Sequence, residues 1–227
     1  KCLRMQGKCL YYIKRYDEAW MLMNQALDIA IQIDNKKQIV ACHKQLYYLC
    51  REFKRVMNER GDEQASTLFF RESLLHEMYF SEKPRLAELT VRYEALRCDI
   101  MQQYYMNKDY DNVIRIATSL DIHDDADPNA SCLVYYYKAQ AYVKLENYPM
   151  AKEAFFREFE LRKKYLGWEE EDTILACQNL GVLHSFCNER EEALACFREA
   201  YGYEVKKNGE DSEMAQKLLQ YISVVES

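Results

Sequence analysis

The chain has 227 residues, of which only six are glycine and three are proline. Tight turns and β-hairpins depend on these two residues, whose usual shares are about 7% and 5%, so their scarcity favours helices joined by short links. The net charge of −6 and the lack of a dense Lys/Arg block disfavour nucleic acid as a ligand, and the 49% of hydrophobic residues argues against a disordered chain.

The first predicted element is a pair of antiparallel helices within residues 1–34. In MQGKCLYYIKRYDEAWMLMNQAL, Gly7 lies in the first helix, a short polar break follows, and Ala19 and Met23 lie in the second helix. Small residues at Gly7 and Ala19 allow two helix axes to approach closely, and a larger residue one turn later fills the remaining gap. The spacing therefore predicts an αα-hairpin.

Two central hairpins, within residues 38–80 and 84–120, keep this spacing with less suitable residues. The residues at the three positions are Phe53, Ala65 and Phe69 in the first of them and Met101, Val113 and Ala117 in the second. Residues 81–106 are also expected to form an unusually long helix, which offers a hinge or a contact surface.

Two further hairpins, within residues 130–166 and 171–206, restore the pattern. The corresponding residues are Ala139, Ala151 and Phe155 in the former and Gly181, Ala193 and Phe197 in the latter. Pro149 falls in the first turn of a second helix, where its missing N–H group is not needed. A last helix, within residues 211–225, is expected to cap the array or to form the first half of another unit.

A hairpin of this kind cannot bury its outer faces alone and must stack on copies of itself. Five such hairpins predict an all-α fold, a right-handed superhelical solenoid that forms a single array over residues 1–227 and ends in the capping helix. Five units exceed the three or so needed for a stable stack, so the array is expected to fold without a ligand.

The repeated pattern resembles the tetratricopeptide repeat, which has a small residue in its first helix and Ala-x-x-x-aromatic in its second. The last unit, RKKYLGWEEEDTILACQNLGVLH, is further similar to the longer repeat of kinesin light chain, through Leu166-Gly167 and Asn179-Leu180-Gly181. Glu170-Glu171 stands where that family commonly has His-Pro. The resemblance implies an array that binds a protein or peptide along its inner face.

No catalytic, cofactor-binding or metal-binding motif is recognisable, so an enzyme is not expected. The chain lacks a phosphate loop, a G-x-S-x-G elbow and an H-E-x-x-H pair. DIHDDADP, which contains His123 and ends in Asp127-Pro128, is interpreted as an acidic loop that opens a helix, since its spacing does not fit an EF-hand. His184 is expected in the core, and His43 and His76 have no partner that the sequence identifies.

Nine cysteines are scattered along the chain without a C-x-x-C pair. This distribution favours reduced thiols that pack as small hydrophobic residues in a cytoplasmic protein. The sequence contains no run of 18 apolar residues, so no membrane-spanning helix is expected. The chain begins within a helix, so it is expected to be a fragment of a longer protein, and Leu3, Leu10 and Ile13 at this end offer a surface for a homodimer.

The concave wall of such a superhelix is lined by the first helix of each hairpin. Positions three before, one after and four or five after the small residue are expected to face the groove. The candidate peptide-binding residues are Arg4, Lys8, Tyr12, Lys54, Gln102, Tyr105, Tyr136, Gln140, Gln178, Asn179, Val182 and Phe186. An acidic peptide would suit the basic N-terminal wall, and the alternative is that Arg4, Lys8 and Lys54 are solvated surface charges.

Two functions remain open. The first is a non-enzymatic scaffold that holds a protein segment or peptide in its groove, with neither nucleic acid nor a membrane as partner. The alternative is a peptide-sensing regulatory module of a bacterial signalling or transcription-regulating protein, in which the ligand tightens the superhelix. The imperfect central hairpins and the long helix expected over residues 81–106 are the features that suit this alternative.

Overall fold

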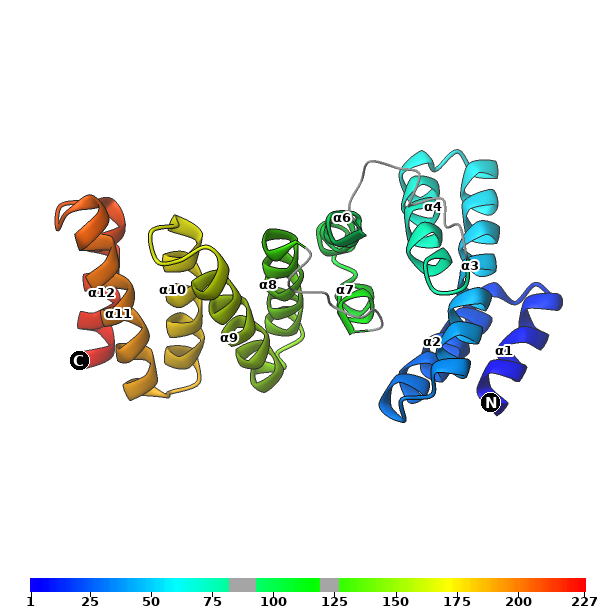
Figure 1. Cartoon of the computed structure of the whole chain (residues 1–227), viewed down its shortest axis with the longest axis horizontal. Coiled ribbons are helices and arrows are strands. Elements are labelled where there is room, and N and C mark those ends of the chain that lie inside the picture. Colours follow the sequence, from blue (N-terminus) through cyan, green and yellow to red (C-terminus); the bar gives the residue numbers. More distant parts are fainter. Residues whose placement is uncertain (82–92, 119–126) are drawn as a thin grey trace. The chain divides into compact units, whose positions relative to one another are not determined.

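The computed structural model describes residues 1–81, 93–118 and 127–227, and all regular secondary structure in these ranges is α-helical (Figure 1). The described helices are α1 (Cys2–Tyr12), α2 (Tyr16–Gln32), α3 (Lys36–Glu59), α4 (Glu63–Glu77), α6 (Tyr93–Met106), α7 (Tyr110–Thr118), α8 (Pro128–Lys144), α9 (Tyr148–Tyr165), α10 (Glu171–Phe186), α11 (Arg190–Asn208) and α12 (Glu213–Glu226). The predicted all-α class is confirmed. The long helix expected over residues 81–106 lies partly outside the described residues, and α6 is its described part.

The chain forms two compact units, and the division falls between α6 and α7. In the first unit, α1 packs on α2, α2 on α3 and α3 on α4, and α6 also packs on α4. In the second unit, α8 to α12 pack in the same successive manner. This nearest-neighbour packing is the arrangement of a helical repeat. No helix in the described ranges is both long and apolar enough to cross a membrane.

The same turn joins the two helices of all five predicted hairpins. One residue in each turn has a left-handed backbone conformation, one position before the residue that caps the second helix. These residues are Lys14 (φ 63°), Gly61 (74°), Lys108 (60°), Glu146 (57°) and Asn188 (60°). Residues other than glycine rarely adopt this conformation. The turn that joins α2 to α3 has the same feature at Asp34 (φ 47°), so this conformation recurs both within and between the hairpins.

The turn also sets the register of the second helix in each hairpin. The residue five positions after the left-handed residue is buried in every case: Ala19 (0% exposed), Ser66 (4%), Val113 (0%), Ala151 (0%) and Ala193 (0%). In the second hairpin this residue is Ser66, one position beyond the expected Ala65, which is only partly buried. The register follows from Gly61, the residue of NERGDEQ that most readily adopts the left-handed conformation, and the expectation of Ala65 did not take it into account.

The shift by one residue changes which side chains meet in the second hairpin. Lys54 takes the place expected for Phe53, and its ammonium lies 4.4 Å from the centre of the Phe70 ring. Phe53 instead stacks on Phe69, with ring centroids 4.9 Å apart, and meets Trp20 edge-on at 5.6 Å. Adjacent aromatic residues in α4 therefore serve two different contacts.

In the last hairpin, α10 and α11 approach each other closely at Gly181, as the sequence predicted. A Cβ atom on Gly181 in α10 would lie 2.8 Å from Cε1 of Phe197 in α11, a side chain that is 1% exposed. The Phe197 ring stacks on Tyr221 of α12 at 5.1 Å, and Leu218 of α12 is fully buried in the same core. These contacts show that the last helix, α12, packs on α11 and continues the core of the second unit.

Candidate functional site

An apolar pocket of about 250 Å³ lies on the second unit. It is formed by α8, the N-terminal half of α9, and α10. We call it the apolar pocket, and its lining residues are Gln140, Val143, Tyr148, Phe155, Asn179, Val182, Leu183 and Phe186. Because α8 and α10 are the first helices of consecutive hairpins, the pocket lies on the surface that the repeat pattern assigns to ligand binding.

The walls of the apolar pocket combine a buried floor with exposed hydrophobic side chains. Phe155 and Leu183 are 3% and 5% exposed, whereas Val182 is 41% and Phe186 is 65% exposed. The Phe186 ring lies 5.0 Å from that of Tyr148, which links α10 to α9 across the pocket. Exposed apolar side chains gathered around a pocket are typical of a binding surface.

Two side-chain amides supply the polar groups of this pocket. Gln140 comes from α8 and Asn179 from α10, and both are partly buried. An amide side chain has both donor and acceptor atoms, so it can hydrogen bond to the N–H and C=O groups of a peptide backbone. The arrangement suits a ligand that places an apolar side chain in the pocket and its backbone along the rim.

A second pocket, of about 540 Å³, lies on the first unit between α3 and α4. We call it the basic pocket, and its lining residues are Arg51, Glu52, Lys54, Arg55, Asn58, Phe70 and Ser73. Three of these side chains are cationic and one is anionic. The basic pocket therefore carries a positive charge on a protein whose net charge is −6.

The three cations of the basic pocket differ in their contacts. Arg55 forms ion pairs with Glu52 at 3.1 Å and Glu59 at 2.6 Å, and the hydrogen bonds that it donates to these carboxylates raise the pKa of Arg55. Arg51 donates to the Tyr47 hydroxyl at 3.4 Å. Lys54 contacts the face of the Phe70 ring. Among the residues that the structure describes, Arg51 and Lys54 form no ion pair with a carboxylate, so their charges can attract an anionic ligand.

Five of the sequence-predicted groove residues line a pocket. Gln140, Asn179, Val182 and Phe186 line the apolar pocket, and Lys54 lines the basic pocket. The structure therefore brings together the four predicted C-terminal residues on α8 and α10.

Three predicted residues lie on α1. Arg4 donates through Nε to Gln38 Oε1 of α3 at 3.2 Å, so it ties two helices together. The Lys8 ammonium lies 5.8 Å from the centre of the Tyr12 ring, and Tyr12 is 69% exposed. Leu3 and Leu10 pack against the core of the first unit, while Ile13 is exposed.

The remaining predicted residues differ in how far their side chains are buried. On α6, Gln102 is exposed and Tyr105 is partly buried. Tyr136 of α8 packs against the core of the second unit and meets Tyr137 edge-on at 5.4 Å. Gln178 was expected on the groove wall, but it is only 5% exposed, so its side chain is buried among the packed helices.

Sequence reasoning missed Arg51 and Arg55. Its offsets were counted from Phe53, whereas Lys54 occupies the equivalent position, seven residues before the left-handed Gly61. Counting three back and one forward from Lys54 gives Arg51 and Arg55, which both line the basic pocket. The glycine in NERGDEQ was the available signal.

The other residues that the sequence singled out have structural contacts. His184 pairs through Nδ1 with Glu189 at 2.6 Å, and Lys152 of α9 contacts the same carboxylate, which lowers the pKa of Glu189. In DIHDDADP, residues 121–126 lie outside the described residues, and Asp127 accepts from the Ala130 N–H at 3.2 Å as the N-cap of α8.

No family model matches the chain, and no curated protein matches it. Among solved structures, the fold is similar to that of BtubC (BKLC) from P. vanneervenii, with 13% sequence identity and a TM-score of 0.54. The matched region covers 89% of this chain and 80% of that chain. At this identity the likeness concerns the fold, and it agrees with an all-α helical repeat.

Proposed function

We propose that the chain is a non-enzymatic scaffold of the tetratricopeptide type, which binds an extended peptide segment of a partner protein on the first helices of its hairpins. The apolar pocket is the observation that carries the proposal. It places four of the predicted groove residues around one cavity, with a buried floor and two amides at its rim. A cavity of about 250 Å³ suits one or two apolar side chains of a peptide.

The basic pocket supports an acidic residue in a partner segment. Arg51 and Lys54 present their charges beside Phe70, so a carboxylate group can bind while its neighbouring methylene groups contact the ring. Exposed ion pairs contribute only about 0–1 kcal/mol each. The affinity for the peptide is therefore expected to depend mainly on the apolar pocket. The basic pocket is expected to make this affinity depend on the salt concentration.

The experiment starts with selection of a random peptide library, displayed on phage, against the immobilised chain. An enriched peptide is synthesised, and its affinity is measured by calorimetry for the wild type, Phe186→Ala and Phe156→Ala. Phe156 is a matched control because it is 50% exposed on α9 and lines neither pocket. Loss of an aromatic anchor from a binding pocket costs about 2 kcal/mol or more, so Phe186→Ala should weaken binding about 30-fold.

The same peptide tests the charge contribution. Lys54→Glu should weaken the binding of an acidic peptide and reduce its salt dependence, whereas Lys37→Glu, at the exposed start of α3, should change neither. A library that yields no enriched peptide, or equal affinities for Phe186→Ala and the wild type, would contradict the proposal. Equal effects of the two lysine variants would reject the acidic-peptide component alone.

A further inference from the structure

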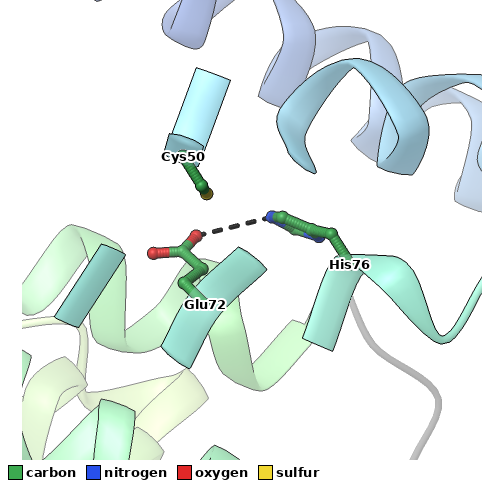
Figure 2. A group of neighbouring side chains, drawn as sticks. All are labelled: Cys50, Glu72 and His76. Carbon is green, nitrogen blue, oxygen red and sulfur yellow. Dashed lines mark ion pairs between the residues drawn. The ribbon is translucent and has the colours of Figure 1, made fainter. Parts of the chain in front are cut away.

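Three buried side chains of the first unit direct a sulfur, an oxygen and a nitrogen atom toward one another (Figure 2). They are Cys50 of α3 and Glu72 and His76 of α4, and one donor atom of each lies within 4.8 Å of the other two. Glu72 Oε1 is 3.5 Å from His76 Nε2. All three residues are 0% exposed. The cluster is separate from both pockets, since none of its members lines them.

Two further residues orient the donor atoms of this cluster. Nδ1 of His76 lies 2.9 Å from Nδ1 of His43, so the other ring nitrogen, Nε2, faces Glu72. The Tyr104 hydroxyl of α6 donates to Glu72 Oε2 at 2.6 Å, which leaves Oε1 on the side of His76. Histidine and carboxylate ligands of metal ions characteristically have such second contacts, which fix the tautomer and the orientation.

We propose that Cys50, Glu72 and His76 bind a zinc ion. Thiolate, imidazole and carboxylate are the ligands that zinc takes in proteins, with bonds of about 2.0–2.3 Å. In a tetrahedral site such bonds place neighbouring donor atoms about 3.3–3.7 Å apart. The 3.5 Å between Glu72 and His76 fits this spacing, and the Cys50 sulfur reaches it by a shift of about an ångström.

Charge and ligand type select the same ion. A thiolate and a carboxylate together balance the charge of a divalent cation, which favours its burial. The sulfur ligand disfavours magnesium and calcium, which take oxygen ligands. With three protein ligands, a water molecule completes the coordination. The zinc ion connects α3 to α4. Its binding therefore stabilises the hairpin of these two helices, whose packing residues depart from the repeat pattern.

Cobalt is the probe, because it replaces zinc in such sites and its spectrum reports thiolate ligands. The full chain is unfolded with chelator and reductant, refolded, and titrated with cobalt and then with zinc. The wild type should bind one cobalt per chain with a thiolate-to-cobalt charge-transfer band, and zinc should abolish that band. Zinc should also raise the melting temperature.

A matched pair of cysteine variants identifies the ligand. Cys50→Ser should lose the charge-transfer band, whereas Cys42→Ser should retain it, because Cys42 is 1% exposed on the same helix but outside the cluster. His43→Leu should keep the band and weaken cobalt affinity about 10–100-fold, as expected for a positioning residue.

Three outcomes would overturn the proposal. The first is a folded wild type that shows no stoichiometric charge-transfer band and no zinc-dependent rise in melting temperature. In that case, the five side chains form a hydrogen-bonded network without a metal. The second is equal loss of the band in Cys50→Ser and Cys42→Ser, which would indicate adventitious thiol binding. If Cys50→Ser does not fold, Glu72→Gln is measured in its place. The third outcome is that Glu72→Gln binds cobalt with the affinity of the wild type.

Discussion

Gly181 and Phe197 illustrate how single residues determine the distance between two helices. A methyl group on Gly181 would lie 2.8 Å and 2.9 Å from two carbons of the Phe197 ring and 3.0 Å from Cβ of Cys196. The Phe197 ring is buried and stacked on Tyr221, so it cannot move aside easily. Gly7 has a softer neighbour, because the atom nearest to its added methyl group is the end of the flexible Met23 side chain, at 2.9 Å.

Gly181→Ala should lower the free energy of unfolding by about 1–2 kcal/mol. The cost of overpacking, about 1–3 kcal/mol, exceeds the gain in helix propensity of about 0.5–1 kcal/mol. Gly202→Ala in α11 is the matched control, because its methyl group would have no neighbour within 4 Å and only the gain remains. Urea unfolding followed by circular dichroism measures both. A Gly181→Ala variant as stable as Gly202→Ala would show that the helices tolerate a wider separation.

The cluster of Cys50, Glu72 and His76 could not be recognised from the local sequence. Cys50 and His76 are far apart in the sequence and match no ligand motif, so no metal site was predicted from them. Their donor atoms meet only because α4 packs against α3 in one particular register. That register depends on the left-handed Gly61, which lies in the break NERGDEQ between the two helices.

At the scale of elements, Arg162 belongs to a buried ion pair within α9 and also contacts the start of α10. Arg162 donates to Glu158 at 2.9 Å within α9 and to Asp172 of α10 at 2.9 Å. Arg162 and Glu158 are 5% and 2% exposed, whereas the Asp172 side chain is 65% exposed. Burial raises the pKa of Glu158 to about 7, and the neighbouring Arg162 opposes this rise.

Arg162→Leu should destabilise the protein by about 3–5 kcal/mol at pH 8, because it leaves the Glu158 carboxylate buried without its cation. The pKa of Glu158 is raised from 4.5 in the wild type and should rise further in the variant. Its contribution to stability is therefore present at low pH and lost as pH rises through the folded pKa. The deficit of the variant should shrink between pH 8 and pH 5 in urea unfolding experiments.

Two controls accompany this prediction. Asp172→Asn should cost at most about 1 kcal/mol, since the Asp172 side chain is largely exposed. The double variant Glu158→Leu/Arg162→Leu should recover most of the lost stability and show no such pH dependence. A deficit in Arg162→Leu that stays constant between pH 5 and pH 8 would mean that Glu158 does not titrate in the folded state.

At the scale of the whole molecule, the open question is whether ligand binding changes the conformation. The floor of the apolar pocket consists of side chains that are already buried, Phe155 and Leu183, so the pocket is preformed in the second unit. Preformed sites change little on binding.

The radius of gyration, measured by small-angle scattering, should therefore stay the same when the selected peptide saturates the chain. Phe186→Ala with the same peptide is the control for non-specific effects. Compaction of the wild type but not of this variant would favour the regulatory alternative, in which the ligand tightens the array.

The spacing of small and aromatic residues was enough to predict an all-α chain of helices that pack on their neighbours in sequence. It was enough because close helix packing requires a small residue facing a large one at fixed distances, and this requirement is local to each hairpin. Gly7 with Met23 and Gly181 with Phe197 lie where the pattern expects them. The groove residues of α8 and α10 followed from the same count.

Only the tertiary structure decided where that count fails and what meets across helices. One left-handed residue, Gly61, moves the second hairpin by a position and replaces Phe53 with Lys54. Gln178 is buried even though its hairpin keeps the expected register, so the count alone did not decide which side chains face the groove. The cluster of Cys50, Glu72 and His76 also depends on helix packing, since residues distant in sequence become neighbours only when the helices stack.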